Sequence, residues 1–123
     1  SNTERTIKIS GDLSWITCKD ASSAKIIGMR SLESASRMFK CSYGKELESL
    51  DLSQWDSRNI VSMYRMFYYQ NLNALSDNSG EFTGLSNFSS KKLTDMGYLF
   101  WKCKMPKKID LNHINVSKVT DMT

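Results

Sequence analysis

The 123-residue chain predicts an α/β solenoid, with short parallel strands on one side and short helices on the other. Two observations lead to this fold class. A twelve-residue segment recurs along the chain, and the spacing of its apolar residues changes from alternation to a helical stripe. Because a unit of this size cannot bury its apolar face alone, the copies are expected to stack, giving about three and a half irregular repeats.

The repeat is visible without gaps in three windows: LSQWDSRNIVSM at 52–63, LSNFSSKKLTDM at 85–96 and LNHINVSKVTDM at 111–122. The first, fourth, ninth and twelfth positions are apolar in all three. A more divergent copy, AKIIGMRSLESA at 24–35, places Ile27 at the fourth position and Ala35 at the twelfth. We therefore expect one repeat domain over 24–123, with copies that start near 24, 52, 85 and 111.

Strands are predicted where each copy begins. In LESLDLSQW (47–55) the apolar residues Leu50 and Leu52 alternate with polar ones, and PKKIDLNHI (106–114) has the same alternation. A period of two is typical of a half-buried strand with one polar outer face.

Short helices are predicted after the ninth position. Apolar residues there fall at i, i+3, i+6 and i+7, first in Ile60, Met63, Met66 and Phe67, and again in Leu93, Met96, Leu99 and Phe100. The polar links DSRN and SSKK favour turns, in which Ser57 and Ser90 are turn or cap residues. Recurrence in register indicates that the methionine and phenylalanine stripe forms the core between stacked copies.

Two further segments frame the repeats. Residues 1–23 are expected to be a leader or capping segment, and the wide spacing between the copies at 52 and 85 predicts an insertion loop at 76–84. The acidic part of this loop, SDNSGE at 76–81, is the nearest approach to a cation site, but it lacks a dense acidic cluster. We therefore predict neither a metal nor a cofactor.

The units LDLSQWDSRNIVSMYRMF and LSNFSSKKLTDMGYLFWKC resemble the BspA-like, leucine-rich-repeat surface-protein repeats of bacteria. That motif runs roughly L-D-L-S-x-[WF]-D-x-S-x-V-x-x-M-x-x-M-F-x-x-C. The resemblance covers about residues 24–122 and departs from the motif at Ala35, Gln70, Ser89 and the insertion. It implies a leucine-rich-repeat-like solenoid in a secreted or surface-anchored protein, associated with adhesion and with binding host or matrix proteins.

The sequence thus predicts a non-enzymatic protein-binding or adhesion module at the cell surface or outside the cell. Its partner would be a host or matrix protein, or another surface protein. The exposed strand face is the predicted binding surface, made of Asp51, Ser53, Ser86, Asp110 and Asn112. The alternative function is a structural spacer that presents a distal domain and has no ligand of its own.

Composition argues against other classes of function. The net charge of +4 comes from scattered lysines, which falls short of a nucleic-acid-binding surface, and no apolar run is long enough to insert in a membrane. His113 is the single histidine, and no serine or cysteine is placed beside it by spacing, so an enzyme is not predicted. Cys41 and Cys103 should lie too far apart for a disulfide, while a Cys18–Cys41 pair stays open.

Two features leave alternatives open. The aromatic residues that flank the apolar stripe either pack at its edge or form an exposed patch of the kind that interfaces favour: Tyr64, Tyr68, Tyr69, Tyr98 and Trp101. The sequence ends at VTDMT, where the motif would continue to a second Met-Phe. We expect an open apolar edge there, covered by further repeats or by a neighbouring molecule through end-to-end self-association.

Overall fold

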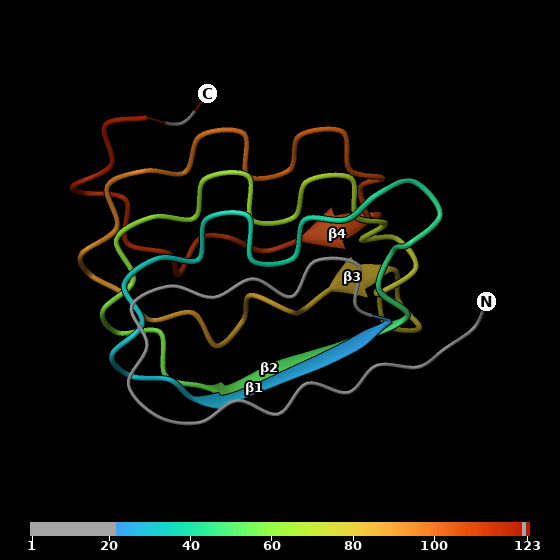
Figure 1. Ribbon diagram of the computed structural model, residues 1–123, viewed down its shortest axis with the longest axis horizontal. Coiled ribbons are helices and arrows are strands. Elements are labelled where there is room, and N and C mark those ends of the chain that lie inside the picture. The colour runs from blue at the N-terminus through green and yellow to red at the C-terminus, as the bar shows by residue number, and fades with distance from the viewer. Residues whose placement is uncertain (1–21, 122) are drawn as a thin grey trace.

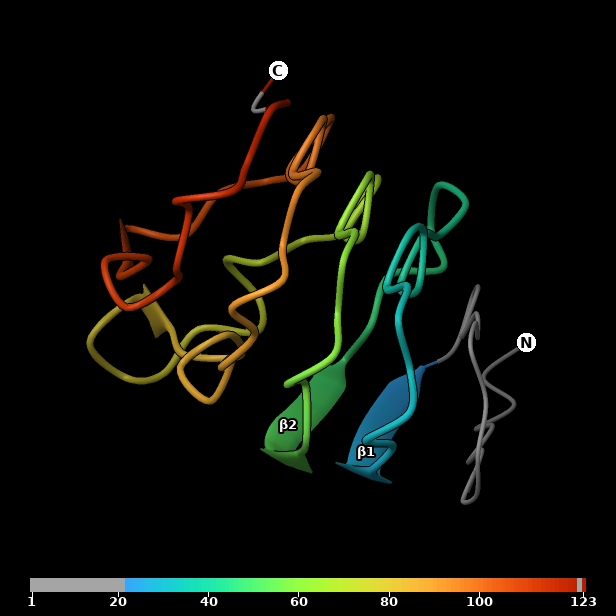
Figure 2. The same ribbon diagram turned by 90° about the vertical axis from the view of Figure 1, so that its left-hand side faces the viewer.

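The computed structural model describes residues 22–121 and residue 123, so nearly all of the predicted leader at 1–23 lies outside the described residues. The described chain winds into coils that stack side by side, which Figure 2 shows nearly edge-on. In Figure 1 successive coils drawn in teal, green and orange carry square, step-like bends along one side, and these bends lie over one another.

Parallel pairing holds neighbouring coils in register. Strand β1 (Ser23–Gly28) pairs with β2 (Ser49–Trp55), and β3 (Glu81–Phe82) pairs with β4 (Lys108–Ile109), both in parallel. Isolated parallel bridges also link the eleventh positions of the four aligned copies in sequence: Ser34, Ser62, Asp95 and Asp121. Equivalent residues of the copies therefore lie above one another.

The predicted fold class is wrong, because the described residues contain no helix. The segments expected to be helical form paired turns instead. In the coil at 63–70, Met66 N–H donates to Met63 O and Gln70 N–H donates to Phe67 O, which closes two successive four-residue turns. The third residue of each turn has positive φ, 51° at Arg65 and 68° at Tyr69, as a type II turn requires.

Hydrogen bonds between coils explain why this arrangement forms in place of a helix. Every second amide of the coil donates to a carbonyl of the next coil at 2.9–3.3 Å: Met63 to Asp95, Arg65 to Gly97, Phe67 to Leu99 and Tyr69 to Trp101. The turns and the Ser62 hydroxyl accept the remaining amides of 63–70. Two helical turns would gain few internal hydrogen bonds for a costly nucleus, whereas stacking satisfies the whole segment.

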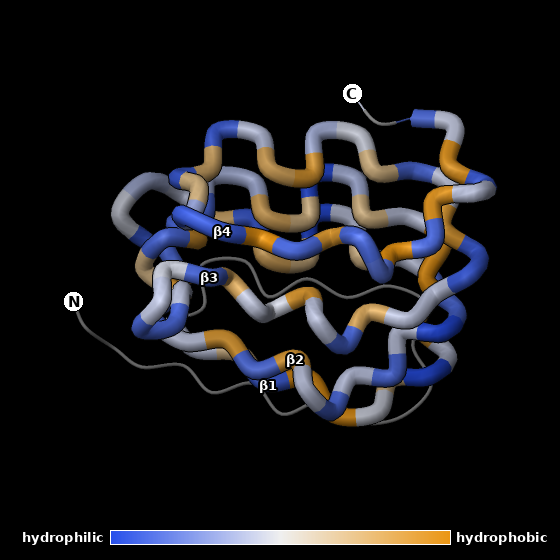
Figure 3. The backbone as a smooth tube through the Cα atoms, turned by 180° about the vertical axis from the view of Figure 1, so that it is seen from behind, coloured by the Kyte–Doolittle hydropathy of each residue, from blue (hydrophilic) through white to orange (hydrophobic). Residues whose placement is uncertain are grey.

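The core lies inside the coils. The first and fourth residues of each turn point inward, so Met63, Met66 and Phe67 are fully buried. Phe67 stacks between the rings of Phe39 and Phe100, with centroids at 5.7 and 6.1 Å. Hydrophobic stretches recur at the same places in neighbouring coils, as Figure 3 shows.

Gln70 is a fully buried polar residue that ties three parts of the chain together. Its Nε2 donates to Phe39 O at 2.6 Å in the preceding coil, and its Oε1 accepts from Leu47 N–H at 2.9 Å. Cys103 occupies the equivalent place in the next coil, where its thiol donates to Phe67 O at 2.8 Å. This position therefore supplies a donor to the phenylalanine carbonyl of the coil before it.

Two local predictions also need correction. The ladder between β1 and β2 is irregular between Lys25 and Ile27, so Ile26 turns inward while Ile27, expected at a buried position, is 45% exposed. The insertion at 76–84 is not all exposed loop, since it ends in strand β3 and buries Phe82. In the loop before β3, the carboxylate of Asp77 accepts hydrogen bonds from the amides of Ser79 and Glu81, which fixes the conformation of the turn.

Substituting Gly84 by alanine should destabilise the protein, because Gly84 lies against the buried ring of Phe82. A Cβ at this position would lie 2.8 Å from Phe82 Cε1 and closer still to Cζ. Phe82 packs edge-on against Phe67 at 5.7 Å and cannot move freely. We expect Gly84→Ala to lower the free energy of unfolding by about 1–3 kcal/mol, measured by urea denaturation.

The Phe82→Ala background supplies the control. Without the ring, adding the methyl group at Gly84 should cost much less. The double mutant should therefore lose less stability than the sum of the losses of the two single mutants. Equal costs of Gly84→Ala in both backgrounds would contradict the steric origin.

Candidate functional site

The five residues of the predicted strand face do not form one surface of a continuous sheet. Asp51 and Ser53 lie on β2, but Ser86 lies in a turn after β3, and Asp110 and Asn112 follow β4 without belonging to it. Strands β2 and β3 belong to separate two-stranded sheets. The structure therefore divides the predicted residues into two groups. The first is Asp51 and Ser53, and the second is Ser86, Asp110 and Asn112.

The polar groups in this region are mostly engaged locally. Asp51 accepts from both the amide and the hydroxyl of Ser53, at 2.9 and 2.6 Å, and these hydrogen bonds hold the pKa of its carboxyl below the usual range. Asp110 likewise accepts from the amide of Asn112 at 2.9 Å. Such short-range bonds are typical of side chains that shape turns.

A polar pocket of about 260 Å³ lies beside the second group and is lined in part by Glu81, Ser86, Asp110 and His113. His113 Nε2 must donate to Leu85 O, which lies 2.7 Å away, because a carbonyl can only accept. The hydroxyl of Ser86 donates to Thr83 O at 2.6 Å. With both groups directed to backbone carbonyls, the pocket holds no serine–histidine pair arranged for nucleophilic catalysis.

The most distinctive surface is formed by the outward side chains of the paired turns. The second and third residues of each turn point away from the core, and in successive coils they bring aromatic and cationic side chains together. We call this surface the ring-and-cation face, which consists of Tyr64, Tyr68, Tyr69, Tyr98 and Trp101 with Arg37, Lys40, Arg65 and Lys102.

The rings of the face touch one another both within a coil and between coils. Tyr98 lies 6.0 Å from Tyr64 in the coil before it and 5.3 Å from Trp101 in its own coil, as measured between ring centroids. Trp101 in turn lies 5.2 Å from Tyr68, which meets Tyr69 edge-on at 4.6 Å. The five rings therefore form one continuous patch in which Trp101 is 36% exposed.

Arg65 occupies the centre of this patch. Its guanidinium carbon lies 4.5 Å from the centroid of Trp101, and 5.1 and 5.3 Å from those of Tyr64 and Tyr98. Its Nε is buried and has no hydrogen-bond partner among the described residues. The ring faces, which carry partial negative charge, thus stabilise this cation.

The other cations border the patch. Lys102 Nζ lies 5.2 Å from Trp101 and 5.4 Å from Tyr69, Lys40 lies over Tyr68 at 5.6 Å, and Arg37 lies over Tyr64 at 5.0 Å. The ion pairs Lys25–Asp51 and Arg58–Asp56 both lie outside the face. The face therefore presents positive charge next to exposed aromatic surface.

Backbone strain coincides with this face. Six non-glycine residues of the described chain have positive φ, and five of them carry side chains of the face: Arg37, Arg65, Tyr69, Tyr98 and Lys102. The left-handed conformation costs an L-residue roughly 1–2 kcal/mol, a cost that glycine avoids. The chain nevertheless places large aromatic and cationic residues at these positions.

Sequence reasoning identified only part of this surface. It singled out the five aromatic residues but left edge packing and an exposed patch as alternatives, and it missed the four cations. An arginine or lysine in a predicted helix is an ordinary solvent-facing residue, so no signal in the pattern set these four apart. Their grouping became visible only with the paired turns.

The remaining predictions concern cysteines, metals and membrane spans. No disulfide joins Cys41 to Cys103, and Cys18 lies outside the described residues. Burial raises the pKa of the Cys103 thiol to about 11, so it stays protonated at neutral pH and can donate to Phe67 O. Among residues 22–121 and 123, no three His, Cys, Asp or Glu side chains are arranged to hold a metal ion. No helix in the described part is long and apolar enough to span a membrane.

Comparison with known proteins identifies a family for this chain. Neither the curated proteins nor the solved structures include a significant match to this chain. A family model described as "Mycoplasma protein of unknown function, DUF285" matches residues 33–123, which is most of the chain and includes three of the four aligned copies in full. The chain therefore belongs to the DUF285 family.

Proposed function

We propose that this chain is a non-enzymatic binding module of an extracellular or cell-surface bacterial repeat protein. Its ring-and-cation face recognises an acidic surface on a protein partner, such as a host or matrix protein. Membership of DUF285 and the resemblance to BspA-like repeats support the proposal that the chain is part of a bacterial repeat protein at the cell surface or outside the cell. The net charge of +4 supports an acidic partner, because opposite charge favours encounter.

The observation that carries the proposal is the coincidence of backbone strain with one surface. Glycine at Tyr69 or Lys102 would relax the positive φ of these residues, yet the chain has a tyrosine and a lysine there. Strained residues persist where their side chains serve a purpose that outweighs the conformational cost. Here the side chains of five residues with positive φ all belong to a single patch of rings and cations.

The chemistry of the face suits protein recognition. Tyrosine, tryptophan and arginine are the residues that most often dominate binding energy in interfaces, because they bury a large area and also form hydrogen bonds. The contacts among the rings and Arg65 hold these side chains in place before binding, which reduces the entropy lost on association.

Glycine substitutions can separate binding from folding. Lys102→Gly and Tyr69→Gly should each leave the urea midpoint unchanged or raise it, since relief of backbone strain offsets the lost ring contacts. Both should weaken binding to an acidic member of a panel of immobilised matrix and cell-surface proteins by at least about fivefold. Binding by the parent chain should also weaken as salt is raised.

Matched variants distinguish the competing surfaces. Lys91→Ala removes an exposed lysine outside the face and should bind like the parent chain. Charge reversal at Asp51 and Asp110 tests the strand face predicted from the sequence. Loss of binding on that reversal, with normal binding by both glycine variants, would reject the ring-and-cation face. A parent chain that binds no member of the panel would favour the spacer function.

A further inference from the structure

The guanidinium of Arg65 is held by rings at the centre of the ring-and-cation face. Its carbon lies 4.5 Å from the centroid of Trp101, and 5.1 and 5.3 Å from those of Tyr64 and Tyr98. Its Nε is buried and has no hydrogen-bond partner among the described residues. Burying this N–H without an acceptor costs free energy, which the contacts with the rings offset. The rings therefore fix the orientation of the guanidinium before any partner binds.

The buried Nε decides which edge of this guanidinium a partner can reach. A guanidinium binds a carboxylate through two parallel N–H bonds, either from Nε and one Nη or from both Nη atoms. The first mode is closed at Arg65, because an oxygen cannot reach the buried Nε. The side chain as a whole points away from the core and is partly exposed. The edge formed by the two Nη atoms is therefore the one that faces outward.

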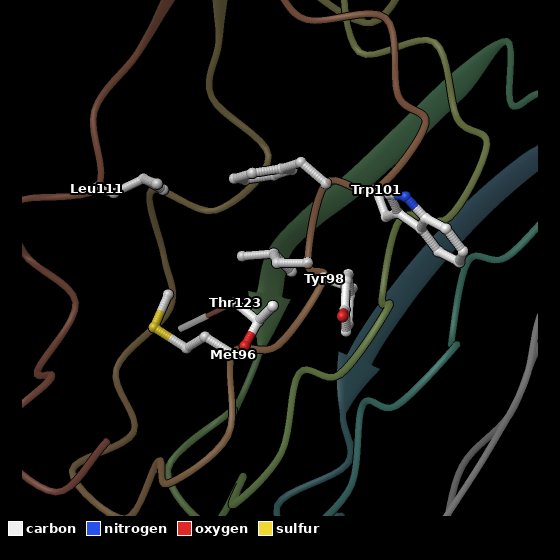
Figure 4. A pocket seen from close by; sticks show the side chains of 7 residues that line it. Met96, Tyr98, Trp101, Leu111 and Thr123 are labelled. Atoms are coloured by element: carbon white, nitrogen blue, oxygen red, sulfur yellow. The ribbon is translucent and has the colours of Figure 1, made fainter. Parts of the chain in front are cut away.

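Aromatic surface and a second cation lie beside this edge. Figure 4 shows the rings of Tyr98 and Trp101 next to each other, pointing away from Leu111. Their centroids lie 5.3 Å apart, and Trp101 is 36% exposed. Lys102 Nζ lies 5.2 Å from the centroid of Trp101, so it adds positive charge near the same ring. The surface around Arg65 thus combines a fork of N–H donors, apolar ring surface and an ammonium group.

We propose that Arg65 is the specificity-determining residue of the face, and that it binds a glutamate or aspartate carboxylate of the partner through both Nη atoms. An apolar side chain next to that carboxylate packs on Trp101 and Tyr98, while Lys102 contributes its charge. The inference rests on the proposed function and deepens it. It requires that the acidic surface of the partner present a carboxylate beside an apolar residue, so that negative charge alone is not enough.

The peptide acetyl-GLELG-amide, which has one carboxylate between two leucines, probes this contact on the full chain. Its affinity is measured by NMR titration, and the side-chain nitrogen signals of Arg65 report the binding mode. We expect larger shifts of the Nη signals than of the Nε signal. A peptide with glutamine in place of the glutamate, and one with serine in place of both leucines, should each bind at least about fivefold more weakly.

Arg65→Lys separates the N–H fork from the charge. Because lysine keeps the charge but lacks the planar fork, this variant should bind the peptide at least about fivefold more weakly. Arg58→Lys is the matched control, since it makes the same exchange at an exposed residue outside the face, and it should bind like the parent chain. The urea midpoints show whether both variants stay folded, and the shifts at Arg65 in the parent chain test the binding mode without any substitution.

Equal affinities of the parent chain and a folded Arg65→Lys variant would overturn the inference, as would a larger shift at Nε than at the Nη atoms. A parent chain that binds the glutamate peptide no better than the glutamine or the serine peptide would also overturn it. The proposed function has its own test, because the binding of immobilised proteins by Lys102→Gly and Tyr69→Gly does not depend on the binding mode of Arg65.

Discussion

Gln70→Ala should lower the free energy of unfolding by about 3–5 kcal/mol, a large share of the stability of a domain of this size. The substitution leaves two buried backbone groups without partners, the carbonyl of Phe39 and the amide of Leu47. Each such loss costs about 1–3 kcal/mol, and the truncated side chain leaves a cavity. Urea denaturation of the variant measures the loss.

Gln70→Cys provides a matched comparison, because cysteine is the residue at the equivalent place in the next coil. A thiol there can still donate to Phe39 O, as Cys103 donates to Phe67 O, but it cannot accept from Leu47 N–H. This variant should therefore lose less stability than Gln70→Ala, by about 1–3 kcal/mol. Equal losses for the two variants would contradict the proposed role of the donor.

Phe67→Ala should also cost about 3–5 kcal/mol, since Phe67 is the middle ring of the stack. It is fully buried and contacts three other rings, those of Phe39, Phe100 and Phe82. Removing it takes apolar contacts from three coils at once and leaves a cavity that the paired turns cannot readily close. Thermal or urea unfolding gives the change in stability.

Phe100→Ala is the internal control for the stack. Phe100 has the same place in the next coil but is only half-buried, because it borders an apolar pocket of about 360 Å³. Its removal should cost clearly less than the removal of Phe67. Equal costs for the two substitutions would contradict the account that burial between neighbouring rings sets the loss.

The register of the copies and much of the core could be predicted from the sequence. Leu52, Leu85, Ile60 and Leu93, all apolar repeat positions, are buried, and the eleventh positions of the copies pair as the gapless alignment implies. Repeats carry this information because stacking forces equivalent residues to meet. The first copy was the least regular, and there the irregular ladder displaced Ile27 from the core.

The spacing of apolar residues is the same in the predicted helices and in paired turns, so it could not distinguish the two structures. Two successive four-residue turns point residues 63, 66, 67 and 70 inward, which is the i, i+3, i+4, i+7 spacing of an amphipathic helix. The two structures differ in where the backbone finds its hydrogen bonds. That depends on a neighbouring coil about thirty residues away, which a local pattern does not contain.

The ring-and-cation face was accessible to sequence reasoning only through its aromatic half. A helix would have spread residues 64, 65, 68 and 69 around its outer side, while paired turns align them with their counterparts in the next coil. Positive φ at arginine, tyrosine and lysine has no signature in the sequence, where glycine or asparagine would be the usual indicator. The strain that identifies the surface therefore required the structure.

The sign of φ at Arg37, Arg65 and Tyr98 tests most directly whether the repeats are stacked paired turns. These residues have φ values of 55°, 51° and 52° and occupy the same place in three successive coils. We predict a strong intraresidue nuclear Overhauser effect between Hα and HN at all three residues. Their three-bond HN–Hα coupling constants should also correspond to positive φ. Helical shifts and negative φ at these residues would contradict the paired turns and the face that they build.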